Sequence, residues 1–333
     1  SNIGGTATLI GDPPNIMIGS QTHLGFMDFV INLTPIIAVV YVLTIFCLKL
    51  IYRRHLVAKP ELMQKITQLN EKDEIKDPAL LKKCLLVLAL TISGFVLHQY
   101  LHLESSVIAL SGASLLLLLT REDPEHALHA VEWPVIFFFV GLFIVVGALE
   151  KVGVIETIAR FSLDVTGGQL VPAAMLILWI SALASAFVDN IPFVATMIPL
   201  IHDMGRLGNL PNLDLLWWSL SLGACLGGNG TAIGASANVV VIGMAEKRGS
   251  PISFLGYMKV AFPLMLMSIA VCNLYLLFWY HYHGWLSLAA TLAAAAALWL
   301  ASLPLEKFLA RREEGVYGEA PPSEREALSR RAM

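Results

Sequence analysis

Residues 4–18 read Gly-Gly-Thr-Ala-Thr-Leu-Ile-Gly-Asp-Pro-Pro-Asn-Ile-Met-Ile, and residues 227–241 read Gly-Gly-Asn-Gly-Thr-Ala-Ile-Gly-Ala-Ser-Ala-Asn-Val-Val-Val. Both stretches place glycine, proline or polar residues inside an otherwise apolar segment, where a helix would be interrupted. The residues that align at a constant offset are the two Gly-Gly pairs, Thr8 with Thr231, Ile10 with Ile233, Gly11 with Gly234, and Asn15 with Asn238. The chain therefore contains two copies of one interrupted motif.

The composition around these motifs is that of a membrane protein. The chain has 333 residues, of which 56% are hydrophobic and 14% charged, and its mean hydropathy is +0.70. An average soluble domain is about 45–50% apolar and about 25% charged. These values exclude an ordinary water-soluble enzyme and a disordered chain, and they predict an all-α polytopic protein in a lipid bilayer. No basic patch suggests a nucleic-acid partner.

Apolar runs give the expected spans, because a membrane-spanning helix needs about 20 mostly apolar residues. The uninterrupted candidates are 28–52, 83–101, 105–120, 133–150, 253–280 and 285–303. Three further apolar segments are interrupted: 3–20, 169–204 and 215–246. Residues 152–166 are typical of a short amphipathic helix at the membrane interface.

Lysine and arginine residues indicate the orientation of these spans, because cytoplasmic loops are enriched in them. They place the charged loop 53–83, Arg121, the Lys247–Arg248 pair and the C-terminal tail in the cytoplasm. The segment 169–204 then leaves and returns on the outer side as a re-entrant hairpin. Two full spans would also return the chain to the same side of the membrane, so charge alone leaves both arrangements open.

The two motifs continue into similar helices of opposite orientation. Phe26 to Pro35 resembles Phe254 to Pro263, yet the charge pattern has the first copy leave outward and the second inward. Inverted repeats with interrupted helices at matching positions are typical of secondary transporters. The alternative is that the glycines only allow close helix packing.

Polar residues at the interruptions are the candidate binding groups. A carboxylate within an apolar segment is costly and suggests function, although Asp189 and Asp12 could each merely cap the helix that follows. Neutral oxygens suit Na⁺ or hydrogen bonds to an oxyanion. The candidate substrate- and ion-binding residues are Asp189, Asn190, Asn229, Thr231, Ser236, Asn238, Thr6, Thr8, Asp12 and Asn15.

These residues should form one site, because lipid cannot satisfy the polar groups at a helix break. We therefore expect the Asp189–Asn190 tip to lie against residues 227–238. Asp189 is expected to carry the coupling ion, H⁺ or Na⁺, so that Asp189→Asn would remove the dependence of transport on that ion. Asp12 is the next candidate.

Other chemistry has no support in the sequence. It contains no GxxxxGK[ST], HExxH or GxSxG motif, and its four cysteines are scattered. No enzymatic activity, no cofactor and no metal centre is therefore expected, apart from a Na⁺ site at the tip and the second break.

The motifs resemble a known family. Residues 1–15, 133–153, 185–192 and 227–238 resemble the ion transporter superfamily, in particular its arsenite-permease/NhaD branch of P-protein-like permeases with a citrate-transporter-like domain. The resemblance implies an elevator-type carrier with H⁺ or Na⁺ coupling. It also implies that an N-terminal part of the family pattern is missing from this chain.

The resulting prediction divides the chain into five parts. They are the end of the first repeat (1–52), the cytoplasmic loop (53–83), connecting scaffold helices (84–132), the second repeat (133–283) with its hairpin (169–204), broken helix (215–246) and helix 253–280, and an extra helix with a cytoplasmic tail (284–333).

The expected function is secondary active transport of an arsenite-like or citrate-like anion, in a bacterial inner membrane. The alternatives are a Na⁺/H⁺ antiporter, a passive channel and a non-transporting scaffold. A homodimer and a separate ATPase subunit stay open as partners.

Overall fold

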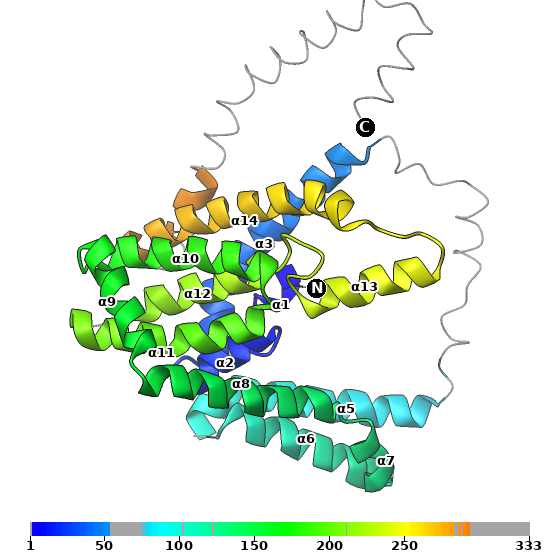
Figure 1. The fold of residues 1–333 in the computed structure, drawn as a ribbon. Coiled ribbons are helices and arrows are strands. Elements are labelled where there is room, and N and C mark those ends of the chain that lie inside the picture. Colours follow the sequence, from blue (N-terminus) through cyan, green and yellow to red (C-terminus); the bar gives the residue numbers. More distant parts are fainter. Residues whose placement is uncertain are drawn as a thin grey trace, which may run out of the picture.

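The computed structural model of the chain describes residues 2–53, 75, 77–101, 103–121, 123–210, 212–282, 286–287 and 289–293. This part of the chain forms helices and contains no strand (Figure 1). The helices are α1 (Asn2–Gly5), α2 (Pro13–Gln21), α3 (Phe26–Ile51), α5 (Pro78–Leu101), α6 (Ser105–Thr120), α7 (Pro124–His129), α8 (Trp133–Lys151), α9 (Val154–Thr166), α10 (Leu170–Phe187), α11 (Asn190–Gly208), α12 (Asp214–Gly227), α13 (Ser236–Lys247) and α14 (Phe254–Tyr282). The predicted all-α class is confirmed.

Several helices have the length and composition of membrane spans. Among the described residues, α3, α8, α10, α14 and Pro78–His98 of α5 are long and apolar enough to cross a bilayer, and α6 is apolar but shorter. The predicted spans between 28 and 280 fall on these helices, which confirms a polytopic membrane protein. Most of the loop 53–83, the helix 285–303 and the tail lies outside the described residues.

The interrupted segment 169–204 forms a helical hairpin. Its arms are α10 and α11, and its tip is formed by Val188 and Asp189. The second arm extends beyond the expected end at 204, because the helix is closed only by Asn209, which adopts a left-handed conformation and donates its N–H to the carbonyl of Gly205. The connector before the hairpin is helix α9, which agrees with the amphipathic helix expected at 152–166.

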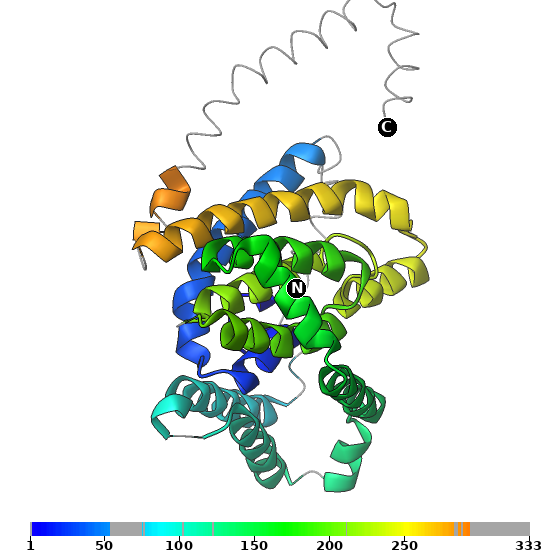
Figure 2. The same ribbon diagram turned by 60° about the vertical axis from the view of Figure 1, so that its left-hand side comes forward.

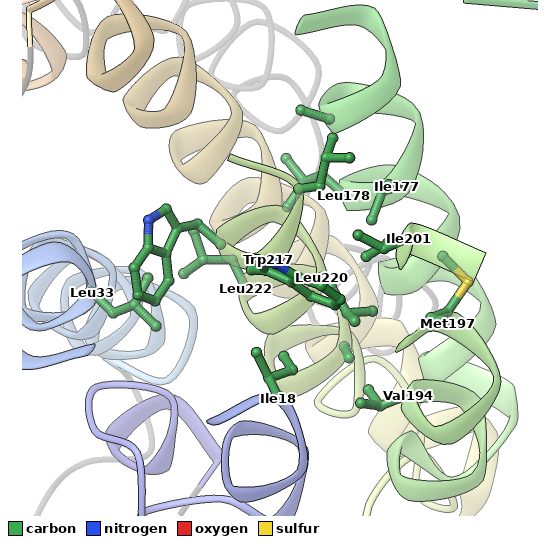
Figure 3. Packing of buried hydrophobic residues seen from close by; sticks show 14 of the residues in the cluster. Ile18, Leu33, Ile177, Leu178, Val194, Met197, Ile201, Trp217, Leu220 and Leu222 are labelled. Atoms are coloured by element: carbon green, nitrogen blue, oxygen red, sulfur yellow. The ribbon is translucent and has the colours of Figure 1, made fainter. Parts of the chain in front are cut away.

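Helix α12 is the centre of the core, because nearly all of its residues are buried. It is apolar around its whole circumference, as expected for a helix enclosed by others. It packs against α10, α11, α14 and α2. The residues around it in Figure 3 are Ile18 and Leu33 from the first repeat, Ile177 and Leu178 from α10, and Val194, Met197 and Ile201 from α11.

The remaining spans lie at the edges of this core. Helices α5 and α6 pair with each other and lie on the opposite side of the bundle from α14 in both views (Figures 1 and 2). Helix α8 leaves most of its large apolar side chains exposed, for example Phe137 and Ile144. Such a surface suits contact with lipid or with a further helix.

The two broken helices run in opposite directions. The first consists of α1 and α2, and the second of α12 and α13. Helix α2 is antiparallel to α12, because Asn15 bonds to Ser221 at one end, whereas His23 lies 3.3 Å from Asp214 at the other. The chain thus passes through the two breaks in opposite directions.

The helices that follow the breaks show the same inversion. Helix α3 is antiparallel to α14, because the Tyr275 hydroxyl and the Trp279 indole donate to Asn32 near the start of α3. Further along α3, the thiol of Cys47 lies 3.7 Å from the sulfur of Met267, which is nearer the start of α14. This arrangement is the one expected for an inverted repeat.

Both breaks close by the same backbone contact between two glycines. An ideal Cβ atom on Gly5 would lie 2.5 Å from the carbonyl oxygen of Gly11, and one on Gly228 would lie 2.8 Å from that of Gly234. A side chain at any of these positions would push the two ends of the break apart. The aligned glycines therefore allow the two ends of each break to approach closely, in addition to any role in helix packing.

The glycine contact predicts the effect of a single methyl group. Gly5→Ala should lower the free energy of unfolding by about 1–3 kcal/mol, because the new Cβ overlaps backbone that cannot move freely. Gly4→Ala is the control, since a Cβ there meets no atom within 4 Å. Thermal unfolding of the purified full-length protein measures the effect of both substitutions. Equal unfolding midpoints for the two variants would contradict the close glycine contact.

Candidate functional site

Three interruptions of the helices meet beside α12. They are the first break between α1 and α2, the hairpin tip at Val188–Asp189, and the second break between α12 and α13. All three expose backbone groups that a continuous helix would pair internally. The hydrogen bonds at this meeting point show how the chain satisfies these groups.

Two equivalent asparagines hold the breaks in shape. The side-chain amide of Asn15 donates to the carbonyls of Thr6 and Thr8 at 3.1 and 3.0 Å. The amide of Asn238 donates to the carbonyls of Gly228 and Thr231 at 2.8 and 3.0 Å. Each amide thus pairs with carbonyls that backbone N–H groups would satisfy in a continuous helix. The alignment of these asparagines in the sequence therefore has a structural cause.

The first break is also fixed to the second repeat through α12. The hydroxyl of Ser221 donates to Oδ1 of Asn15 at 2.6 Å, and the thiol of Cys225 lies 3.5 Å from the same oxygen. Asn15 is fully buried. The sequence analysis missed Ser221 and Cys225, although their spacing of one helical turn places both on the same face of α12.

The hairpin tip lies against the second break, as expected from the sequence. The hydroxyl of Thr231 donates to the carbonyl of Ala186. The hydroxyl of Ser236, at the start of α13, donates to Oδ2 of Asp189 at 3.3 Å. Ser185, also missed, donates to the carbonyl of Ala224 at 2.6 Å. These bonds join the end of α10 and the tip residue Asp189 to the second broken helix.

The two carboxylates of the site differ in their surroundings. Asp189 is partly exposed and caps α11, because its side chain accepts a hydrogen bond from the backbone N–H of Ile191 at 3.0 Å. Asp12 precedes α2 but makes no capping bond, and only 9% of its surface is exposed. The capping role that the sequence left open for both residues is thus found only at Asp189.

The electrostatic balance at the site is negative. Among the residues described, no Lys, Arg or His side chain forms an ion pair with Asp12 or Asp189. The N-termini of α2 and α13 provide the opposite polarity, because Asp12 and Ser236 stand at those ends and both adjoin the hairpin tip. A helix N-terminus carries a partial positive charge that favours anions.

The other predicted residues lie around this centre. Thr6 is buried and its hydroxyl donates to the carbonyl of Asn2 at 2.7 Å, whereas Thr8 contributes its carbonyl to Asn15. Asn190 is buried at the tip. Asn229 lines a cavity of about 430 Å³ between α3 and α14, together with Ile3. No metal-ligating cluster of three or more His, Cys, Asp or Glu occurs within the described ranges.

Comparison with known proteins agrees with this architecture. The citrate transporter family model matches residues 1–223, which is more than half of the chain. The chain belongs to the citrate transporter family. This membership confirms the resemblance found in the sequence.

Similar proteins include uncharacterized transporters. An uncharacterized transporter of Mycobacterium tuberculosis is 44% identical over 283 residues, which cover 85% of this chain and 65% of the relative. The 46 kDa membrane protein of Mycobacterium leprae is 42% identical over 85% of this chain and 66% of its own length. The P protein of Mus musculus is 34% identical over 86% of this chain and 44% of its own length. The chain thus spans about two thirds of the length of the mycobacterial relatives.

The contact between the tip and the second break predicts a cross-link. Asp189→Cys combined with Ser236→Cys should form a disulfide under mild oxidation in membranes, because the replaced side chains are in contact. Asp189→Cys with Gly243→Cys is the matched control, since Gly243 lies about two turns further along α13. The full-length protein is cleaved between the two cysteines, and its mobility on a non-reducing gel shows whether the disulfide still joins the fragments. Equal yields for both pairs would contradict the geometry.

Proposed function

We propose that the protein carrying this chain is an ion-coupled secondary transporter of a small anion, citrate-like or arsenite-like, rather than an enzyme. The observation that carries the proposal is the meeting of a hairpin tip with two breaks that the chain passes in opposite directions. A site enclosed in this way between inverted repeats can open to either side of the membrane in turn. Membership of the citrate transporter family supports the substrate class.

The site offers complementary groups for an anion and for a coupling cation. The N-termini of α2 and α13 present backbone N–H groups to an anion. Carboxylate and amide oxygens at the site suit H⁺ or Na⁺, which favour oxygen ligands. Binding of the cation would compensate the negative charge that otherwise repels an anionic solute.

Movement of the site across the membrane follows from the packing. We propose an elevator-type motion in which the hairpin and the broken helices move together, because the hydrogen bonds of Asn15, Ser185 and Thr231 join them into one unit. Helices α5 and α6 pair mainly with each other and have few contacts with that unit. They would remain in place as part of the scaffold.

The proposed orientation places loop 53–83 and the C-terminal tail in the cytoplasm of a bacterial cell. Its support is the distribution of lysine and arginine residues, which favours the cytoplasmic side of the inner membrane.

Na⁺/H⁺ antiport is the second candidate. The observation that favours it is the pair of carboxylates without a cationic partner in the described part of the chain. In that case the two cations would exchange at the same carboxylates, and no anion would be carried.

Flux measurements distinguish these functions. The full-length protein in liposomes should take up labelled citrate or arsenite faster when a H⁺ or Na⁺ gradient is imposed, whereas an antiporter would change the internal pH on addition of Na⁺ alone. Asn238→Ala should abolish either activity, because the second break loses the amide that satisfies two carbonyls.

Ser93→Ala is the control variant, since this exposed hydroxyl bonds only within α5. Flux that is independent of both gradients would indicate a channel. Unchanged flux in Asn238→Ala would contradict a transport role for the second break, and no flux of any tested solute or ion would favour a scaffold.

A further inference from the structure

We infer that Asp12, rather than Asp189, is the carboxylate that binds the coupling cation, beside the side chains of Asn190 and Cys225. The inference deepens the proposed function and rests on it. It assigns a separate role to each carboxylate: Asp12 holds the cation, and Asp189 positions the hairpin tip.

The first argument is the state of the Asp12 side chain. Its Oδ2 atom is buried and has no hydrogen-bond partner among the described residues. The side chains of Asn190 and Cys225 adjoin the carboxylate, but neither donates a hydrogen bond to that oxygen. A buried carboxylate oxygen without a donor is costly unless a proton or a cation neutralises it. The oxygen is thus left available to such a ligand.

The second argument is a comparison of the two repeats. Ala235 occupies the position equivalent to Asp12, directly before α13, and it has the same extended backbone conformation. The second break forms without a carboxylate there, and Asp12 makes no capping bond in the first. The fold of the break therefore does not require Asp12. The carboxylate is thus a feature of the first break alone, and it is available for a role that the second break does not have.

The third argument is the origin of the groups that face Asp12. Asn190 comes from the hairpin tip and Cys225 from α12, so three elements, which belong to both repeats, meet at Asp12. Among the side chains of the described residues, Asp189 is the charged group that acts on Asp12, and Cys225 is the other titratable group. Both are acidic groups, so neither can neutralise Asp12. A cation bound there would also reduce the repulsion between the two carboxylates.

Asp189 has a different set of bonds. Its two oxygens accept from the backbone N–H of Ile191 and from the hydroxyl of Ser236. An asparagine side chain retains one oxygen that can accept such bonds, so the tip can keep its shape without the charge. Cation binding at Asp12 should therefore survive Asp189→Asn.

The thermal stability of the purified full-length protein tests this assignment. A cation that binds only the folded protein raises the unfolding midpoint as its concentration rises. Midpoints are measured with NaCl against choline chloride at alkaline pH, and from alkaline to acidic pH without Na⁺. The first comparison reports Na⁺ and the second reports H⁺. We expect the wild type to be stabilised in at least one of them.

The variants decide which carboxylate is responsible. Asp12→Asn should lose more than half of that stabilisation, whereas Asp189→Asn should retain most of it. If Asp12→Asn does not fold, Asp12→Ala replaces it, because alanine is the residue of the second repeat at this position. Full stabilisation in the Asp12 variant overturns the inference, as does a wild type that responds to neither cation, or two Asp12 variants that both fail to fold.

The result is separate from the test of transport. Gradient-coupled flux together with unaltered cation stabilisation in Asp12→Asn would overturn the inference and leave the transporter intact. Absence of flux with stabilisation lost only in the Asp12 variants would leave the cation site and overturn the transport function.

Discussion

Backbone groups released by broken helices are the constraint on which this structure depends. A membrane interior offers no water to pair with a free carbonyl, so each break must be satisfied within the protein. Asn15 and Asn238 meet this requirement in the same way, since each donates its side-chain amide to two carbonyls of its own break. The glycine contacts that bring the break ends together make these short bonds geometrically available. Replacement of the helix bonds by side-chain bonds allows irregular backbone to lie inside the bundle.

The position of the site follows from the same constraint. The second break is joined to the hairpin tip by Thr231 and Ser236, and the first break is joined to α12 by Asn15. Because the two broken helices are antiparallel, their half-helices α2 and α13 begin on opposite sides of one tip. The result is a region with polar backbone, two helix N-termini and two carboxylates. In a carrier, such a region is suited to hold a solute and its coupling ion together.

The sequence predicted the parts of the fold that depend on local pattern. Apolar runs located the spans, and the aligned glycines and asparagines located both breaks and their inverted relation. The hairpin was also expected, because Asp189 and Asn190 interrupt the apolar segment 169–204. The end of α11 was missed, since it depends on the left-handed conformation of Asn209. Ser221, Cys225 and Ser185 were missed because their partners are distant in the sequence. The difference between Asp12 and Asp189 could not be predicted, since both precede a helix and they differ only in burial and in their hydrogen bonds.

The most direct test of the account is a cryo-electron microscopy structure of the full-length protein in a lipid nanodisc. The account predicts that Asn190 and both breaks lie near the middle of the bilayer, with α2 and α13 extending from them toward opposite membrane surfaces. It also predicts that α10 and α11 enter and leave on the same side. A hairpin whose tip reaches the far surface, or half-helices that extend toward the same surface, would contradict an enclosed site between inverted repeats.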